Sequence, residues 1–184
     1  MAVGCAANKP HTFGAYTDLA PKVAPQHGER IPQHLTVQVN RPANVAVFFV
    51  VPGRGSQLLF PADSGQTGFL QSGPHLVETS LARQALSDTS KLIRRPNVQA
   101  NTRGQQRRPG GNMDANGPIG ANTRGYLLVY ASQEPLPYNV LSTRVNGISI
   151  PIDDEDALNT VTKLIRETTR TTGTWAAYAA EFPP

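Results

Sequence analysis

The chain has 184 residues, which suits one domain with flexible flanks, and only 39% of them are hydrophobic. Its formal net charge of +4 is uneven, because the segment Arg83–Arg124 alone has eight basic and two acidic residues, a net charge of +6. A single cysteine excludes an intrachain disulfide and a zinc site built from several thiolates. No run of 18 apolar residues is present, so we expect no membrane-spanning helix.

The sequence begins with the small residues Ala2, Val3 and Gly4, followed by Cys5. This pattern resembles the lipobox of bacterial lipoproteins, in which the cysteine becomes lipid-modified. The charged and apolar regions of a signal peptide do not precede it. We predict lipid attachment at Cys5, which would bring the protein to a membrane surface. A free cysteine in a frayed terminus is the alternative.

The following residues are predicted to be a tether. Asn8–Gln33 contains four prolines and few apolar residues, a composition typical of an extended linker. A strap that becomes ordered on a partner is the alternative. Residues 1–33 are therefore assigned to the lipobox-like N-terminus and Pro-rich tether, and residues 34–182 to a β-sandwich domain.

Three β-strands joined by tight turns are predicted between residues 35 and 60. Leu35–Asn40 alternates apolar and polar residues, as in a strand with one buried face. Val45–Val51 is almost entirely apolar, which is typical of a central strand covered on both faces. Gln57–Phe60 follows a turn at Pro52–Gly55 and is predicted to return as the third strand.

More strands are predicted on both sides of the basic segment. Phe69–Leu70 and His75–Leu81 can supply one or two of them, and Gly125–Ala131 supplies another. A last strand is predicted at Thr174–Phe182. Its aromatic residues are favoured as part of the core over an exposed anchor; they are Trp175, Tyr178 and Phe182.

A helix of about four turns is predicted between Asp153 and Gly173 from the spacing of its apolar residues. Asp153 is expected to cap this helix, and Ile152 to pack against Ala157 as a hydrophobic staple. The acidic run Asp153–Asp156 is predicted to be the helix N-terminus rather than a Ca²⁺ site, because it lacks the alternating ligands and turn glycine of an EF-hand loop. The resulting fold is mainly β, a β-sandwich with one C-terminal amphipathic helix and a long basic loop insertion.

The insertion at residues 94–124 is predicted to be flexible and to contact a partner. It is rich in Gly, Asn, Gln and Arg, and it contains the sequence ANTRG twice. Loops of this length are uncommon unless they are functional or disordered, so a solvated loop is the alternative. Nucleic acid is disfavoured as the partner because the insertion lacks interleaved aromatic residues for base stacking. The candidate partner-binding residues are Arg94, Arg95, Arg103, Arg107, Arg108 and Arg124.

Three segments together suggest a family. They are Val45–Val51, Leu58–Pro61 and, after the long insertion, Tyr126–Leu136. This arrangement resembles a β-sandwich domain of unknown function in bacterial envelope proteins, where it is often attached to signal peptides, lipoproteins or larger sensor and protease chains. The resemblance implies a fold and an envelope location, and it brings no catalytic residue with it.

No group of residues with the pattern of a reactive site is found. The four histidines lack metal-ligand spacing, and neither a phosphate-binding loop, a Gly-x-Ser-x-Gly elbow nor a Cys-x-x-Cys-His haem motif occurs. We therefore predict a protein without catalytic residues, metal or cofactor. A hydrolase, the least favoured class, would need a close carboxylate pair or a Ser–His pair.

The predicted function is that of a non-enzymatic accessory or scaffolding subunit. It would lie on the periplasmic side of a bacterial membrane, lipid-anchored or peripheral, and dock on protein subunits of a larger membrane complex. A photosynthetic or respiratory assembly is a suitable host. The alternative is a stand-alone envelope sensory or ligand-binding domain that recognises an anionic polymer through a concave basic pocket.

Overall fold

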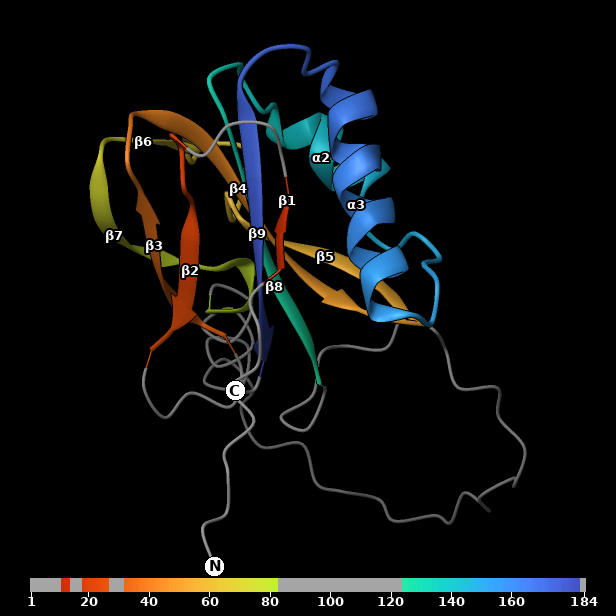
Figure 1. Ribbon diagram of the computed structural model, residues 1–184. Coiled ribbons are helices and arrows are strands. Elements are labelled where there is room, and N and C mark those ends of the chain that lie inside the picture. Colours follow the sequence, from red (N-terminus) through yellow and green to blue (C-terminus); the bar gives the residue numbers. More distant parts are fainter. Residues whose placement is uncertain (1–10, 14–17, 27–31, 83–123, 183–184) are drawn as a thin grey trace, which may run out of the picture.

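The computed structural model describes residues 11–13, 18–26, 32–82 and 124–182 (Figure 1). The fold is mainly β, at 41% strand and 22% helix, with two antiparallel sheets. In chain order the elements are β1 His11–Phe13, β2 Lys22–Pro25, β3 His34–Val39, β4 Ala43–Val51, β5 Gly55–Phe60, β6 Phe69–Leu70, β7 Gly73–Glu78, β8 Gly125–Ser132, α2 Tyr138–Arg144, α3 Asp154–Thr169 and β9 Trp175–Phe182.

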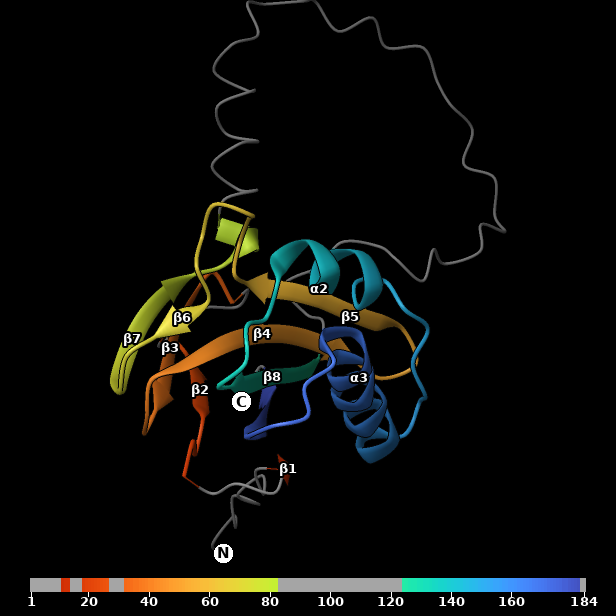
Figure 2. The same ribbon diagram turned by 90° about the horizontal axis from the view of Figure 1, so that it is seen from above.

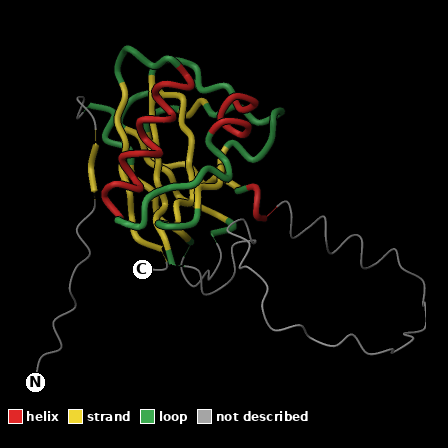
Figure 3. The backbone as a smooth tube through the Cα atoms, turned by 90° about the vertical axis from the view of Figure 1, so that its right-hand side faces the viewer, coloured by secondary structure: helices red, strands yellow, loops and turns green. Residues whose placement is uncertain are grey.

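The larger sheet has the strand order β1-β9-β8-β4-β5, and β6 pairs with the start of β4. The smaller sheet has the order β2-β3-β7. Seen from above, the smaller sheet, the larger sheet and the two helices follow one another as layers (Figure 2). From the side, both helices lie in front of the strands of the larger sheet (Figure 3).

The central strand β4 faces two separate hydrophobic cores. Val45, Val47 and Phe49 belong to the core between the two sheets. Phe48 and Val50 belong to the core between the larger sheet and the helices. Successive side chains of a strand point to opposite faces, so a strand that is covered on both faces must be apolar at every position. The apolar run of β4 meets this requirement, as predicted.

The three strands predicted between residues 35 and 60 are confirmed as β3, β4 and β5. They do not form one sheet, because β3 pairs with β2 and β7 while β4 and β5 pair with each other. The strands predicted at 125–131 and 174–182 are confirmed as β8 and β9. The strand predicted at His75–Leu81 starts and ends earlier, at Gly73–Glu78.

Part of the predicted tether belongs to the folded body. Lys22–Pro25 forms β2, which pairs with β3, and β1 pairs with β9. Leu19 is fully buried and Val23 is 5% exposed, so both contribute to the core between the sheets. Pro25 fits at the end of β2, since β2 is an edge strand of the smaller sheet and proline is tolerated on edge strands.

Helix α3 lies where the amphipathic helix was predicted and begins at the expected N-cap, but it ends earlier. The Asp153 carboxylate accepts a hydrogen bond from the Asp156 backbone N–H at 3.1 Å, as expected of an N-cap. The predicted staple is wrong, because Ile152 is 85% exposed. The helix ends at Thr169 rather than at Gly173, and Arg170 caps it in the left-handed conformation, with φ 55° and ψ 33°.

The sequence predicts one helix after the basic segment, and the structure has two. The additional helix, α2, contains seven residues and follows Pro137. Its only fully buried residue is Leu141, with Val145 buried just after its end. Seven residues span about two turns, which is too short for a clear 3.6-residue apolar period.

The outer edge of β5 is covered by the chain that leaves α2. Ser56 donates its hydroxyl to the Val145 carbonyl oxygen at 2.6 Å, and Gly147 N–H donates to the Ser56 carbonyl oxygen at 2.9 Å. The Asn146 side-chain oxygen accepts from Leu58 N–H at 2.6 Å. These bonds satisfy backbone groups that an edge strand otherwise leaves to solvent.

The helix–sheet core is expected to be a large contributor to stability. Leu158 is fully buried in it, so Leu158→Ala is predicted to lower the free energy of unfolding by about 2–5 kcal/mol, measured by urea denaturation. The matched control is Leu76→Ala on β7, where the side chain is 66% exposed and the change should stay within about 0.5 kcal/mol. Equal effects of the two substitutions would contradict this assignment of the core.

Candidate functional site

Most residues predicted to bind a lipid or a partner lie outside the described residues. These are Cys5, Arg94, Arg95, Arg103, Arg107 and Arg108. Arg124 is described: it is exposed and immediately precedes β8. The next residue, Gly125, has no room for a side chain, because an added Cβ would collide with the carbonyl oxygen of Val50. The basic segment therefore rejoins the body at a tightly packed position.

Acidic groups gather near the start of β8. The Tyr126 hydroxyl donates a hydrogen bond to Asp154 Oδ2 at 2.6 Å. Burial raises the pKa of Tyr126, and the hydrogen bond to Asp154 raises it further. Glu181 on β9 and Asp153 add to this effect through their negative charge. The acidic run thus caps α3 and ties its first turn to the larger sheet.

The aromatic residues of β9 are divided between the two sides of the larger sheet. Phe182 is fully buried and meets Phe49 edge-on, with ring centroids 5.9 Å apart. Trp175 is half-buried on the helix side and stacks on Tyr130 at 5.5 Å. Arg166 of α3 lies 4.7 Å from the centre of the Trp175 ring. The preference for core over an exposed anchor is confirmed for Phe182, and Trp175 holds α3 against the sheet.

Among the described residues, the buried hydroxyl groups of Tyr130 and Thr162 have no well-formed hydrogen bond, although the Tyr130 hydroxyl lies near that of Thr171. Burial raises the pKa of Tyr130 to about 12, and the neighbouring Thr171 and Arg166 offset that rise only in part. A buried hydroxyl without a partner destabilises the folded state. The ring of Tyr130 is well packed, because it stacks on Trp175 and lies in the core between the larger sheet and the helices.

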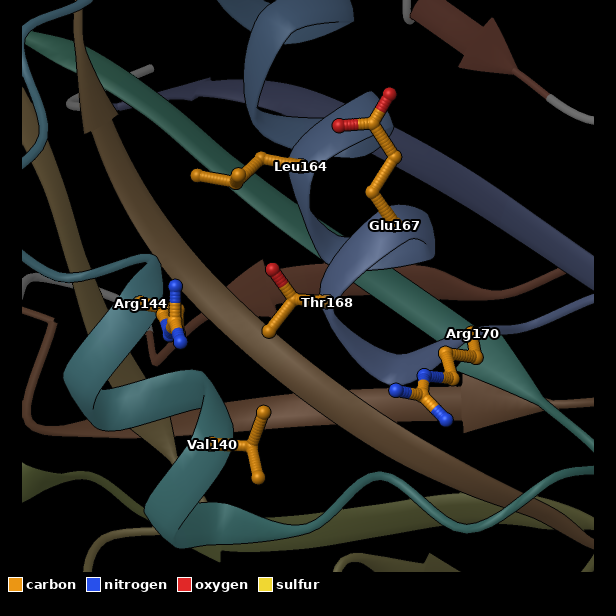
Figure 4. A pocket seen from close by; sticks show the side chains of 6 residues that line it. All are labelled: Val140, Arg144, Leu164, Glu167, Thr168 and Arg170. Atoms are coloured by element: carbon orange, nitrogen blue, oxygen red, sulfur yellow. The ribbon is translucent and has the colours of Figure 1, made fainter.

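A groove of about 400 Å³ runs between the two helices (Figure 4). We call it the α2–α3 groove. Arg144 lies on one side of Thr168 and Arg170 on the other, and Thr168 points into the space between the helices. Its lining residues are Val140, Arg144, Leu164, Glu167, Thr168 and Arg170.

Two of the three charged residues that line the α2–α3 groove are arginines. Neither Arg144 nor Arg170 forms an ion pair with any residue that the structure describes. The Glu167 carboxylate lies 3.8 Å from Lys163, one turn earlier on α3, and points away from Thr168 and Arg170 (Figure 4). An open groove with two guanidinium groups that have no ion-pair partner among the described residues is suited to bind an anion.

The sequence prediction missed this groove. Arg144 lies at the end of a helix too short to recognise, and Arg170 was expected inside a longer helix. The only signal was the cluster of basic residues toward the end of α3, which was explained by the helix dipole alone. The two arginines come together because α2 and α3 pack on the same face of the larger sheet.

Comparison of the chain with models of protein families, with curated proteins and with solved structures found no match. Within the described part of the chain, no group of three His, Cys, Asp or Glu residues is placed to hold a metal ion. No helix in that part is long and apolar enough to cross a membrane. The function is therefore argued from the surface and charge of the chain itself.

The raised pKa of Tyr130 predicts a specific dependence of stability on alkaline pH. Because the pKa is about 12 in the folded protein and 10.0 ordinarily, the unfolded chain releases this proton first. The free energy of unfolding should fall as the pH rises from 10 to 12, and Tyr130→Phe should remove part of that fall. At pH 7 the same variant should lose less stability than Tyr126→Phe, because the Tyr130 hydroxyl has no well-formed hydrogen bond to lose.

Urea denaturation at several pH values measures both effects. The control is Tyr126→Phe, which removes a hydroxyl that has a partner and should cost about 1 kcal/mol at pH 7. A Tyr130→Phe variant that is less stable than Tyr126→Phe at pH 7 would contradict the description of Tyr130.

Proposed function

We propose that this protein is a non-enzymatic accessory or scaffolding subunit of the bacterial envelope. It would be held on the periplasmic side of a membrane through lipid on Cys5 and would dock on protein subunits of a larger membrane complex. We propose a photosynthetic or respiratory assembly as the kind of complex on which it docks. The proposed contact residues are the arginines of the basic segment, and neither nucleic acid nor a cofactor is part of the proposal.

The observation that carries this proposal is the separation of charge along the chain. The described residues include eight basic and ten acidic side chains, whereas residues 83–124 have a net charge of +6. The positive charge therefore belongs to one segment inserted between two strands of the folded body. A concentrated basic segment favours contact with an acidic protein face or anionic lipid and speeds encounter with it.

The fold supports a scaffolding role. We propose that the two sheets, which share one hydrophobic core, act as a β-sandwich that presents the basic segment as a loop insertion. The second face of the larger sheet is covered by α2 and α3. A body of this kind has a fixed shape from which an inserted segment can reach a partner.

Docking can be tested by purification from gently solubilised native membranes through a C-terminal tag. We expect membrane proteins in stoichiometric amounts, identified by mass spectrometry, and their loss when the basic segment is neutralised. That variant carries glutamine in place of Arg94, Arg95, Arg103, Arg107, Arg108 and Arg124.

The control for docking replaces three exposed basic residues of the body, Lys22, Arg41 and Arg54, by glutamine. It should retain the partners, because the proposal assigns contact to the basic segment rather than to positive charge in general. Recovery of the tagged protein alone would overturn the proposal.

Lipid attachment is a separate part of the proposal. Cys5→Ala is expected to move the protein from the membrane fraction to the soluble fraction, measured by fractionation at high salt. Mass spectrometry of the N-terminal peptide should show a lipid on Cys5 in the original chain. An unmodified cysteine with unchanged membrane association would contradict lipid anchoring and leave peripheral binding through the basic segment.

A second candidate is a stand-alone envelope domain that recognises an anionic polymer. It is favoured by the α2–α3 groove, which is concave and has two arginines without ion-pair partners among the described residues. This candidate predicts that the protein is recovered alone from membranes and binds the polymer without another protein.

A further inference from the structure

We propose that the α2–α3 groove is a binding site for a phosphate monoester that carries a small apolar group. This inference does not depend on docking or on lipid attachment, since none of the residues that form the groove belongs to the basic segment or to the N-terminus. The proposed ligand also differs from the anionic polymer of the second candidate function, because it has a single phosphate group.

The donors for such a ligand come from three positions. Arg144 is the last residue of α2, Thr168 lies in the last turn of α3, and Arg170 caps α3. Figure 4 shows Thr168 between the two arginine side chains. Guanidinium groups bind phosphate oxygens through charge-assisted hydrogen bonds, and a threonine hydroxyl adds a neutral donor.

The backbone at Arg170 has a conformation that helix ends usually give to glycine. Helices often end with a glycine in the left-handed conformation, because other residues adopt it at a cost of about 1–2 kcal/mol. This helix ends with an arginine at φ 55° instead. As a cation at the C-terminus of α3, Arg170 also complements the helix dipole, as Arg166 in the last turn does.

The number of charges favours a phosphate monoester over a carboxylate. A monoester has a charge of about −1.5 to −2 near pH 7 and three oxygens that accept hydrogen bonds. Arg144 and Arg170 together supply two positive charges and donors from two directions. A carboxylate has one charge and two oxygens, which one guanidinium can satisfy in a bidentate pair.

The remaining walls limit the rest of the ligand. Val140 and Leu164 give the groove an apolar side, and its volume of about 400 Å³ lies in the range of small-molecule sites. Glu167 is at the rim and is exposed. The two arginines supply two positive charges, which match one phosphate monoester rather than several phosphates. A single phosphate on a small apolar group therefore fits better than a chain of phosphates.

The test is a titration of the full chain with phenyl phosphate, followed by calorimetry and by NMR chemical shifts of the groove residues. We expect saturable binding and shifts at Val140 and Thr168. Arg144→Gln and Arg170→Gly should each weaken binding about tenfold, the usual effect of losing one charge-assisted hydrogen bond. Arg54→Gln, an exposed arginine outside the groove, should leave binding unchanged.

Arg170→Gly separates binding from folding. Glycine adopts the left-handed conformation without a steric penalty, so this variant should be at least as stable as the original chain in urea denaturation while it binds more weakly. Unchanged phenyl phosphate binding in this stable variant would overturn the role of Arg170.

Three other ligands complete the test. Inorganic phosphate should bind more weakly than phenyl phosphate, because it does not use Val140 and Leu164. Benzoate that binds as tightly as phenyl phosphate would overturn the assignment to phosphate, and polyphosphate that binds more tightly would overturn the single-phosphate site. The chain with the neutralised basic segment should bind phenyl phosphate normally, so failure of docking and failure of this site are distinguishable.

Discussion

The larger sheet is apolar on both faces, and the rest of the fold follows from the need to cover it twice. In β4 and β8 successive residues enter different cores, so neither face can be left in water without a large loss of hydrophobic stabilisation. The smaller sheet covers one face and the two helices cover the other. This requirement explains why β2, β3 and β7 form a separate sheet on one face of the larger sheet. It also explains why α2 and α3, which follow β8, pack on the other face. The α2–α3 groove exists because two helices share one face.

Sequence patterns were sufficient to predict the long elements, in which the same pattern of apolar residues continues over many positions. The apolar run of β4 and the acidic first turn with the apolar stripe of α3 predicted a doubly covered strand and a capped helix. Short elements gave no such signal: α2 has seven residues and β2 has four. Both are formed by tertiary packing rather than by local preference, as the burial of Leu141 in α2 and of Val23 in β2 indicates.

The two candidate surfaces differ in how they could be found. The basic segment is a property of composition, so it is visible in the sequence without any knowledge of the fold. The groove is a property of packing, because Arg144 and Arg170 are far enough apart in the chain that only the meeting of two helices joins them. The end of α3 at Arg170 could not be predicted from the sequence either, because it depends on the backbone conformation of one residue. A left-handed arginine resembles an ordinary helical residue in a sequence, and Gly173 offered a more familiar end.

The loop that covers β5 has a consequence for assembly. Residues 145–147 use hydrogen-bonding groups along the outer edge of this strand, through bonds that involve Ser56 and Leu58. A foreign strand that added to this edge would first have to displace the loop, which protects the larger sheet on this side from extension into aggregates. For the same reason, another protein chain could not continue the sheet here while the loop is in place. Association at this side of the molecule would be built from side chains, which can be separated again without unfolding a strand.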